Sequence, residues 1–250
     1  TIPYRLENVL SGIKAEGRWF VDSRRGYVYL WPPGDIDPNN AMVTAPFQSA
    51  AIMLQGDAAG DGVVHDVHFH ELTVVNASLH REKKRKDAPS ANAFNTGDSA
   101  LRLSDTEDCR IENCCFERNN GTAIIADGIC RRLGVSACSI ADCGGGGISL
   151  AGGVAVPQPP PATDNRIVGN HVRRCGLLYW HSVGVSIGLS SKTLVKGNHI
   201  HDMPYAGIAS SGLRHRWFAN WPRPRPELEA LWAEHGDGEP TPKNVKRLLP

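Results

Sequence analysis

Two consecutive stretches decide the fold of this chain: CRIENCCFERNNGTAI at residues 109–124 and LGVSACSIADCGGGGI at residues 133–148. Ile111 and Val135 hold the same place in the two stretches, 24 residues apart, and a later apolar position, Ile124 in the first stretch, recurs after the same interval. Short apolar segments that recur at a fixed period of a few tens of residues are the signature of a solenoid. The two stretches therefore predict a repeated fold.

Two later stretches continue the pattern, RIVGNHVRRCG at 166–176 and LVKGNHIHDMPYAGI at 194–208, and a weaker copy begins at Phe69. Each copy has an apolar residue at its anchor and another five residues later, and most have a third at thirteen. In the third copy the equivalent residue, Val185, comes eighteen residues after the anchor, because residues 177–182 are inserted before it.

The spacing of these apolar residues indicates short β-strands wound in one coil. Leucine-rich repeats have a similar length, but their Leu-x-x-Leu-x-Leu pattern is missing here. Coils stack about 4.8 Å apart, at the spacing of paired strands. Like residues therefore form ladders, with Cys114 over Cys138 and Asn170 over Asn198. The sequence predicts an all-β fold, a parallel β-helix with a period near 24 residues.

Segments outside the repeats divide the chain further. Residues 19–22 and 27–31, separated by Ser-Arg-Arg-Gly, are typical of a β-hairpin. Most glycines are expected to mark coil turns. The predicted parts are a hairpin extension at 1–46 packed on the solenoid, coils at 47–212 with inserted loops at 79–98 and 153–163, and an irregular tail at 213–250 that can form a short helix at 226–235.

Composition excludes several classes of function. The formal net charge is +1, so there is no basic field for nucleic acid. No apolar run is long enough to span a membrane. The seven cysteines are odd in number and contain no Cys-x-x-Cys pair, so we expect small buried residues rather than disulfides. Asp66 with His65, His68 and His70 forms an acidic, His-rich patch, but we expect no metal site and no cofactor.

Three stretches carry a likeness to a known family: residues 7–41, residues 64–78, and GNHIHDMPYAGI at 197–208 preceded by LLYWHSVGVSIG. Over residues 4–212 the sequence resembles right-handed parallel β-helix proteins of the pectate-lyase-like superfamily, in particular large secreted bacterial glycoside hydrolases such as family 141. The resemblance implies further coils on both sides, so we expect a central fragment. It also implies a secreted or periplasmic protein, although no signal peptide precedes Thr1 in this chain.

One column of charged residues is the first candidate for chemistry. It lies seven residues after each anchor and alternates in sign, through Arg118, Asp142, Arg174 and Asp202. Asp142 and Asp202 are two coils apart, about 10 Å between backbones. Carboxyl groups about 6.5–9.5 Å apart suit an inverting glycosidase. The alternative is a salt-bridged ladder in which Arg174 only holds the stack together.

Aromatic and histidine side chains gather near this column. The inserted turn Leu177–His181 offers groups that stack on sugars and bond to them, and Tyr205 follows close behind. The resemblance places His201, Asp202 and Tyr205 in its most specific stretch. The candidate catalytic residues are Asp202, Asp142 and His201, and the candidate substrate-binding residues are His181, Trp180, Tyr179, Tyr205 and Arg174.

The preferred interpretation is a carbohydrate-active β-helix, a glycoside hydrolase that cleaves a polysaccharide or oligosaccharide in a groove along the coils. The partner is then a glycan. A polysaccharide lyase or epimerase, which needs a base and a cation, is the second enzymatic interpretation. A non-catalytic glycan-binding or structural segment remains the alternative from another class, because one superfold hosts many functions.

Overall fold

The computed structural model describes residues 8–38, 40–44, 48, 50–57, 62–77, 99–152 and 162–211. The chain divides into two compact units, Thr1–Ala45 and Pro46–Pro250. Within the described ranges, no helix is long and apolar enough to cross a membrane. The predicted loop at 79–98, nearly all of the loop at 153–163, and the tail with its short helix lie outside the described residues.

The first unit contains the predicted hairpin. A short 3-10 helix, η1 (Leu10–Gly12), precedes β1 (Trp19–Asp22), which pairs with β2 (Tyr27–Leu30) in antiparallel register. The carboxylate of Asp22 caps the turn by accepting hydrogen bonds from the backbone N–H groups of Arg24 and Arg25. The hairpin is confirmed, whereas its packing on the solenoid stays a prediction.

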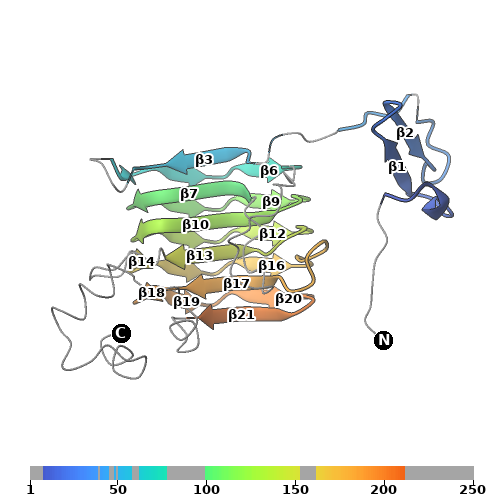
Figure 1. Ribbon diagram of the computed structural model, residues 1–250. Helices are drawn as coiled ribbons and strands as arrows, with labels where there is room; N and C mark the ends of the chain where they lie inside the picture. Colours follow the sequence, from blue (N-terminus) through green and yellow to red (C-terminus); the bar gives the residue numbers. More distant parts are fainter. Residues whose placement is uncertain are drawn as a thin grey trace, which may run out of the picture. The chain divides into compact units, whose positions relative to one another are not determined.

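The second unit is a solenoid of three parallel sheets, whose strands stack coil on coil in Figure 1. The largest sheet has nine strands: β3 Ile52–Gln55, β4 Val64–His65, β7 Ser99–Glu107, β10 Thr122–Arg131, β13 Ile148–Gly152, β14 Ala162–Thr163, β17 Val183–Gly188, β18 Ser190–Ser191 and β21 Ala206–Ser211. The second sheet has five: β5 His68–His70, β8 Arg110–Glu112, β11 Gly134–Ser136, β15 Arg166–Val168 and β19 Leu194–Lys196. The third also has five: β6 Thr73–Val75, β9 Cys115–Glu117, β12 Ser139–Ala141, β16 His171–Arg173 and β20 His199–His201.

The strand register confirms the alignment of the repeats. The anchors are direct neighbours across the second sheet, in the order Phe69, Ile111, Val135, Ile167 and Val195. In the largest sheet, Ile148 pairs with Val185, so the insertion in the third coil leaves the register intact. The all-β parallel β-helix is confirmed.

Each coil turns on single residues in the left-handed backbone conformation, five residues apart. These corner residues have φ between 47° and 67° and form three columns along the solenoid. The first corner column is Asp66, Asp108, Arg132, Asp164 and Lys192; the second is Glu71, Asn113, Ala137, Gly169 and Gly197; the third is Asn76, Arg118, Asp142, Arg174 and Asp202. A single left-handed residue bends the chain sharply at each corner. Because the corners are five residues apart, a three-residue strand fits between them.

Gly144 to Gly147 serve a different purpose from the corner residues. Gly144 to Gly147 lie between β12 and β13, as expected, but none of them has a positive φ. A Cβ atom at Gly146 would lie 2.7 Å from the backbone oxygen of Val183, and one at Gly147 would lie 2.5 Å from that of Gly184. These glycines are therefore needed because the next coil approaches closely, whereas Asp, Asn and Arg occupy most corners.

The core is filled by ladders of equivalent residues. Ile111, Val135 and Ile167 are at most 2 % exposed, as are Phe116, Ile140 and Val172 in the neighbouring sheet. All seven cysteines are free, and six of them are buried. The thiol of Cys138 lies in reach of the Ile111 carbonyl oxygen, 3.5 Å away, in the preceding coil. The expectation of small buried cysteines is confirmed.

The predicted asparagine ladder joins successive coils at the second corner. The Asn170 side chain accepts a hydrogen bond from the Cys138 backbone N–H at 3.0 Å and donates one to the Val135 carbonyl at 3.0 Å. Asn198 repeats both bonds one coil further on, to Asn170 N–H and to the Ile167 carbonyl. These amides, of which that of Asn170 is buried, satisfy backbone groups that the corner leaves without a strand partner.

We expect Asn170→Ala to lower the free energy of unfolding by about 2–4 kcal/mol, because two buried backbone groups lose their partners. Urea unfolding followed by circular dichroism measures this change. Asn120→Ala is the matched control, since Asn120 is exposed, and it should cost less than about 0.5 kcal/mol. Equal losses in the two variants would contradict the role of the ladder.

Candidate functional site

A groove of about 670 Å³ lies over the second sheet, along β5, β8, β11 and β15. It therefore crosses four successive coils. Its charged and titratable lining consists of Asp66, His68, Asp108, Arg110, Glu112, Arg132 and Arg166. None of the residues predicted for the site from the sequence lines this groove.

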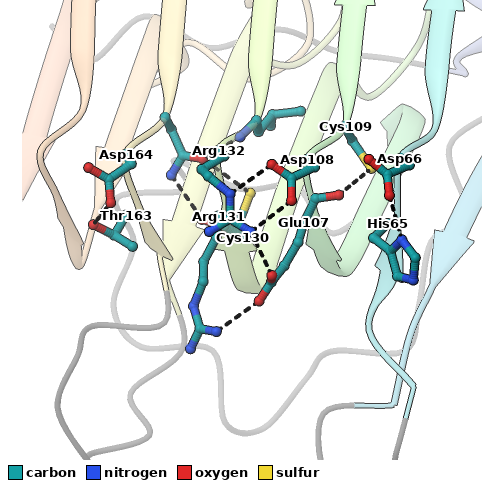
Figure 2. A network of polar contacts seen from close by, with 12 residues as sticks. His65, Asp66, Glu107, Asp108, Cys109, Cys130, Arg131, Arg132, Thr163 and Asp164 are labelled. Atoms are coloured by element: carbon teal, nitrogen blue, oxygen red, sulfur yellow. Dashed lines mark hydrogen bonds and ion pairs between the residues drawn. The ribbon is translucent and has the colours of Figure 1, made fainter.

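The first corner column forms one wall of the groove, with its ion pairs drawn in Figure 2. Arg132 binds Asp108 through two parallel hydrogen bonds of 2.7 Å and reaches Glu107 at 2.8 Å. Arg131 binds the other carboxylate oxygen of Glu107, also at 2.8 Å. The hydrogen bonds from Arg132 hold the pKa of Asp108 below its ordinary value, so Asp108 stays ionised.

The floor of the groove carries two kinds of polar group. The imidazole Nε2 of His68 lies 3.0 Å from a carboxylate oxygen of Glu112, so this pair can exchange a proton. Arg110 and Arg166 are both exposed and share one row of the sheet, on either side of Gly134. Within the described part of the chain, neither guanidinium is paired with a carboxylate. The groove thus offers two cations and a carboxyl–imidazole pair to a ligand.

The predicted column of alternating charge exists, as the third corner column. Arg174 binds both carboxylate oxygens of Asp142 at 2.7 Å. These hydrogen bonds lower the pKa of Asp142, which keeps it ionised and unsuited to donate a proton. Arg118 bonds instead to Glu117 at 3.1 Å. The Asp142–Arg174 pair therefore forms part of the predicted ladder, and a catalytic role for Asp142 stays a prediction.

Asp202 belongs to a different group of contacts at the same edge. Its carboxylate lies 2.8 Å from Nδ1 of His201, and Nε2 of His201 lies 2.8 Å from Nε2 of His171. His199 stacks on His171 with ring centroids 4.9 Å apart. One nitrogen from each of the three imidazoles lies within 4.8 Å of the others. Burial lowers the pKa of His171, and the charges of its two histidine neighbours lower it further.

The sequence interpretation missed this histidine cluster and expected no metal. Its signal was nevertheless present. His199-Ile200-His201 places two side chains on one face of a strand, and His171 stands at the same repeat offset as His199. Grouping His201 only with its neighbour Asp202 leaves out the coil beside it, which supplies His171.

The aromatic candidates lie beside the third corner column. The ring of His181 contacts that of Tyr205, with centroids 5.8 Å apart, and both residues are exposed. Trp180 is 57 % exposed and so leaves its indole face accessible. Tyr179 is half-buried, and its backbone N–H donates to the carbonyl of Gly144. The structure brings His181 and Tyr205 together, whereas substrate binding by these residues stays a prediction.

We expect Asp142→Asn to lower the free energy of unfolding by about 0.2–1 kcal/mol at neutral pH, as is usual for a partly exposed ion pair. Because folding lowers the pKa of Asp142 from 3.8, this stabilisation is present above pH 3.8 and is lost as the pH falls through the folded-state pKa. Urea unfolding at neutral pH and near pH 2 tests this. The control is Asp164→Asn, at an exposed corner where no arginine of the described ranges forms an ion pair. An Asp142→Asn effect that persists in acid would contradict the prediction.

Comparison with known proteins gives one match. A family model described as a right handed beta helix region matches residues 86–218. Neither the comparison with curated proteins nor the comparison with solved structures finds a match to this chain. The matched residues cover more than half of the sequence, and their parallel strands stack as that family requires. The chain therefore belongs to the right-handed β-helix family.

Proposed function

We propose that this protein is carbohydrate-active and binds a glycan in the groove over the second sheet, where it hydrolyses a glycosidic bond. The groove carries the proposal, because it runs across four coils and is lined by side chains that bond to sugars. An elongated ligand suits a site that continues from coil to coil. The resemblance to large secreted glycoside hydrolases such as family 141 supports the same function and a secreted location.

Arg110 and Arg166, which have no carboxylate partner among the described residues, indicate an acidic glycan. Arg110 and Arg166 lie in one row, separated by Gly134, which has no side chain to fill the space between them. A guanidinium binds a carboxylate through two parallel hydrogen bonds. Two such groups spaced along the groove can bind successive acidic units of one chain. On the wall, Arg132 already binds Asp108, and Arg131 and Arg132 bind Glu107 behind it, whereas Asp66 contacts His65.

The Glu112–His68 pair is the proposed proton donor and acceptor for hydrolysis in this groove. The two side chains are in hydrogen-bond contact, and both lie among the lining residues. Asp108, held ionised by Arg132, is the proposed second carboxylate, on the wall of the groove. Glycoside hydrolysis requires two carboxyl groups, and different neighbours allow one to donate a proton while the other stays ionised.

The third corner column gives the second candidate site for the same reaction. There Asp202 and His201 share a hydrogen bond, Asp142 is paired with Arg174, and His181 and Tyr205 offer rings for a sugar. Removal of a proton from the sugar is an alternative reaction at either site, followed by elimination in a lyase or by return of a proton to the opposite face in an epimerase. Glycan binding without turnover is the alternative from another class.

We expect Arg110→Ala and Arg166→Ala each to weaken binding of an acidic oligosaccharide such as oligogalacturonate about tenfold or more, since each removes a charge-assisted hydrogen bond. Titration calorimetry with acidic and neutral plant-wall and algal glycans measures this. The control is Arg24→Ala, which removes one exposed arginine from the hairpin. Binding that is equally strong in all three variants would contradict a glycan in the groove.

We expect Glu112→Gln to lower turnover by about 10²- to 10⁴-fold, the usual contribution of a general acid or base. Release of reducing ends without an unsaturated product identifies hydrolysis rather than elimination. Asp202→Asn is measured beside it. A loss of turnover confined to Asp202→Asn would place the reaction at the third corner column. Glycan binding without any turnover would show that the protein binds a glycan but does not cleave it.

A further inference from the structure

We propose that His171, His199 and His201 bind a divalent transition-metal ion, zinc in the first instance, on the outer face of β16 and β20. Each imidazole offers one nitrogen, and the three nitrogens all lie within 4.8 Å of one another. This site is separate from the groove, whose lining includes none of the three residues.

The β-helix itself places the three rings. His199 and His201 are alternate residues of β20, so their side chains lie on the same face. His171 pairs directly with His199 in the parallel register of β16 and β20. The ring centroids are consequently 4.7–5.1 Å apart in all three pairs. Backbone hydrogen bonds between coils hold the two strands in this register, so the three rings are gathered on one face.

A second contact orients one of the ligands. Nδ1 of His201 lies 2.8 Å from the Asp202 carboxylate, which makes Nδ1 the protonated nitrogen and leaves the lone pair on Nε2. A carboxylate behind a ligating histidine is the usual outer partner in metal sites. The same Nε2 lies 2.8 Å from Nε2 of His171, so it is placed to accept the proton of that nitrogen. A metal ion replaces that proton, after the rings move apart to the roughly 3.3 Å that two tetrahedral ligands at about 2.05 Å require.

The donor chemistry selects the class of metal. Neutral imidazole nitrogens suit zinc, copper, nickel and cobalt, whereas calcium and magnesium prefer oxygen ligands. Three protein ligands leave a coordination position for water or another small ligand, as in zinc sites built from three histidines. His199 is exposed, so an ion can reach this position from solvent.

The test measures binding of Zn²⁺ to the full chain after dialysis against a chelator. We expect one Zn²⁺ per chain at this site, and a loss of affinity of more than about 100-fold in His171→Ala, His199→Ala or His201→Ala, because losing a ligand costs more than losing its outer partner. Asp202→Asn should weaken binding about 10- to 100-fold. Circular dichroism checks that each variant is folded, which is expected because the three side chains lie on the outer face.

Two control variants match these changes. His181→Ala removes an exposed histidine outside the cluster. Asp66→Asn breaks the His65–Asp66 contact of 2.7 Å, the same arrangement as His201–Asp202 but at another corner. Both should bind Zn²⁺ as the unchanged chain does, and Co²⁺ in the site should give the visible absorption of a tetrahedral ion. The proposal is overturned if the chain binds no Zn²⁺, or if the controls lose as much affinity as the cluster variants.

Discussion

The structure of the solenoid depends on corners made by single residues in the left-handed conformation. For a residue other than glycine this conformation costs on the order of 1 kcal/mol or more, and the described coils contain many such residues. Asp and Asn tolerate it better than other side chains, and they occupy several corners. The remainder, including Arg118, Arg132 and Arg174, are held there because strands on both sides are paired with the neighbouring coils.

The corners also decide where charge collects. A corner residue points outward in every coil, so each column becomes a row of closely spaced side chains on the surface. Opposite charges in such a row pair across coils, as Arg132 does with Asp108 and Arg174 with Asp142. Much of the charge in the columns is thus used to join coils. Arg110, Arg166 and the histidines of β16 and β20 lie on the strand faces between the corners, where they can bind ligands.

The two sites use the same property of a parallel β-helix on two different sheets. Strands in register repeat each side-chain position at every coil. Residues at equivalent positions of successive coils, and not residues of one loop, therefore form each proposed site. In the second sheet this repetition spaces Arg110 and Arg166 along the proposed glycan path. In the third sheet it brings His171 beside His199 at bonding range for one ion. The groove and the histidine cluster share no residue, so binding of a glycan in the groove and binding of a metal ion at the cluster can be tested separately.

The sequence by itself determined the coil, its register and its ladders, because an apolar residue facing the core must recur at every turn of the solenoid. Ile111 over Val135, the delayed Val185 and the Asn170–Asn198 ladder all follow from spacing. Only the tertiary structure decided which surface groups meet. Outward residues carry no packing constraint. Spacing therefore places Arg174 in the column of Asp142 and Asp202, and His171 beside His199, but it does not reveal that Arg174 bonds to Asp142, that His201 bonds to His171, or that the groove lies over the second sheet.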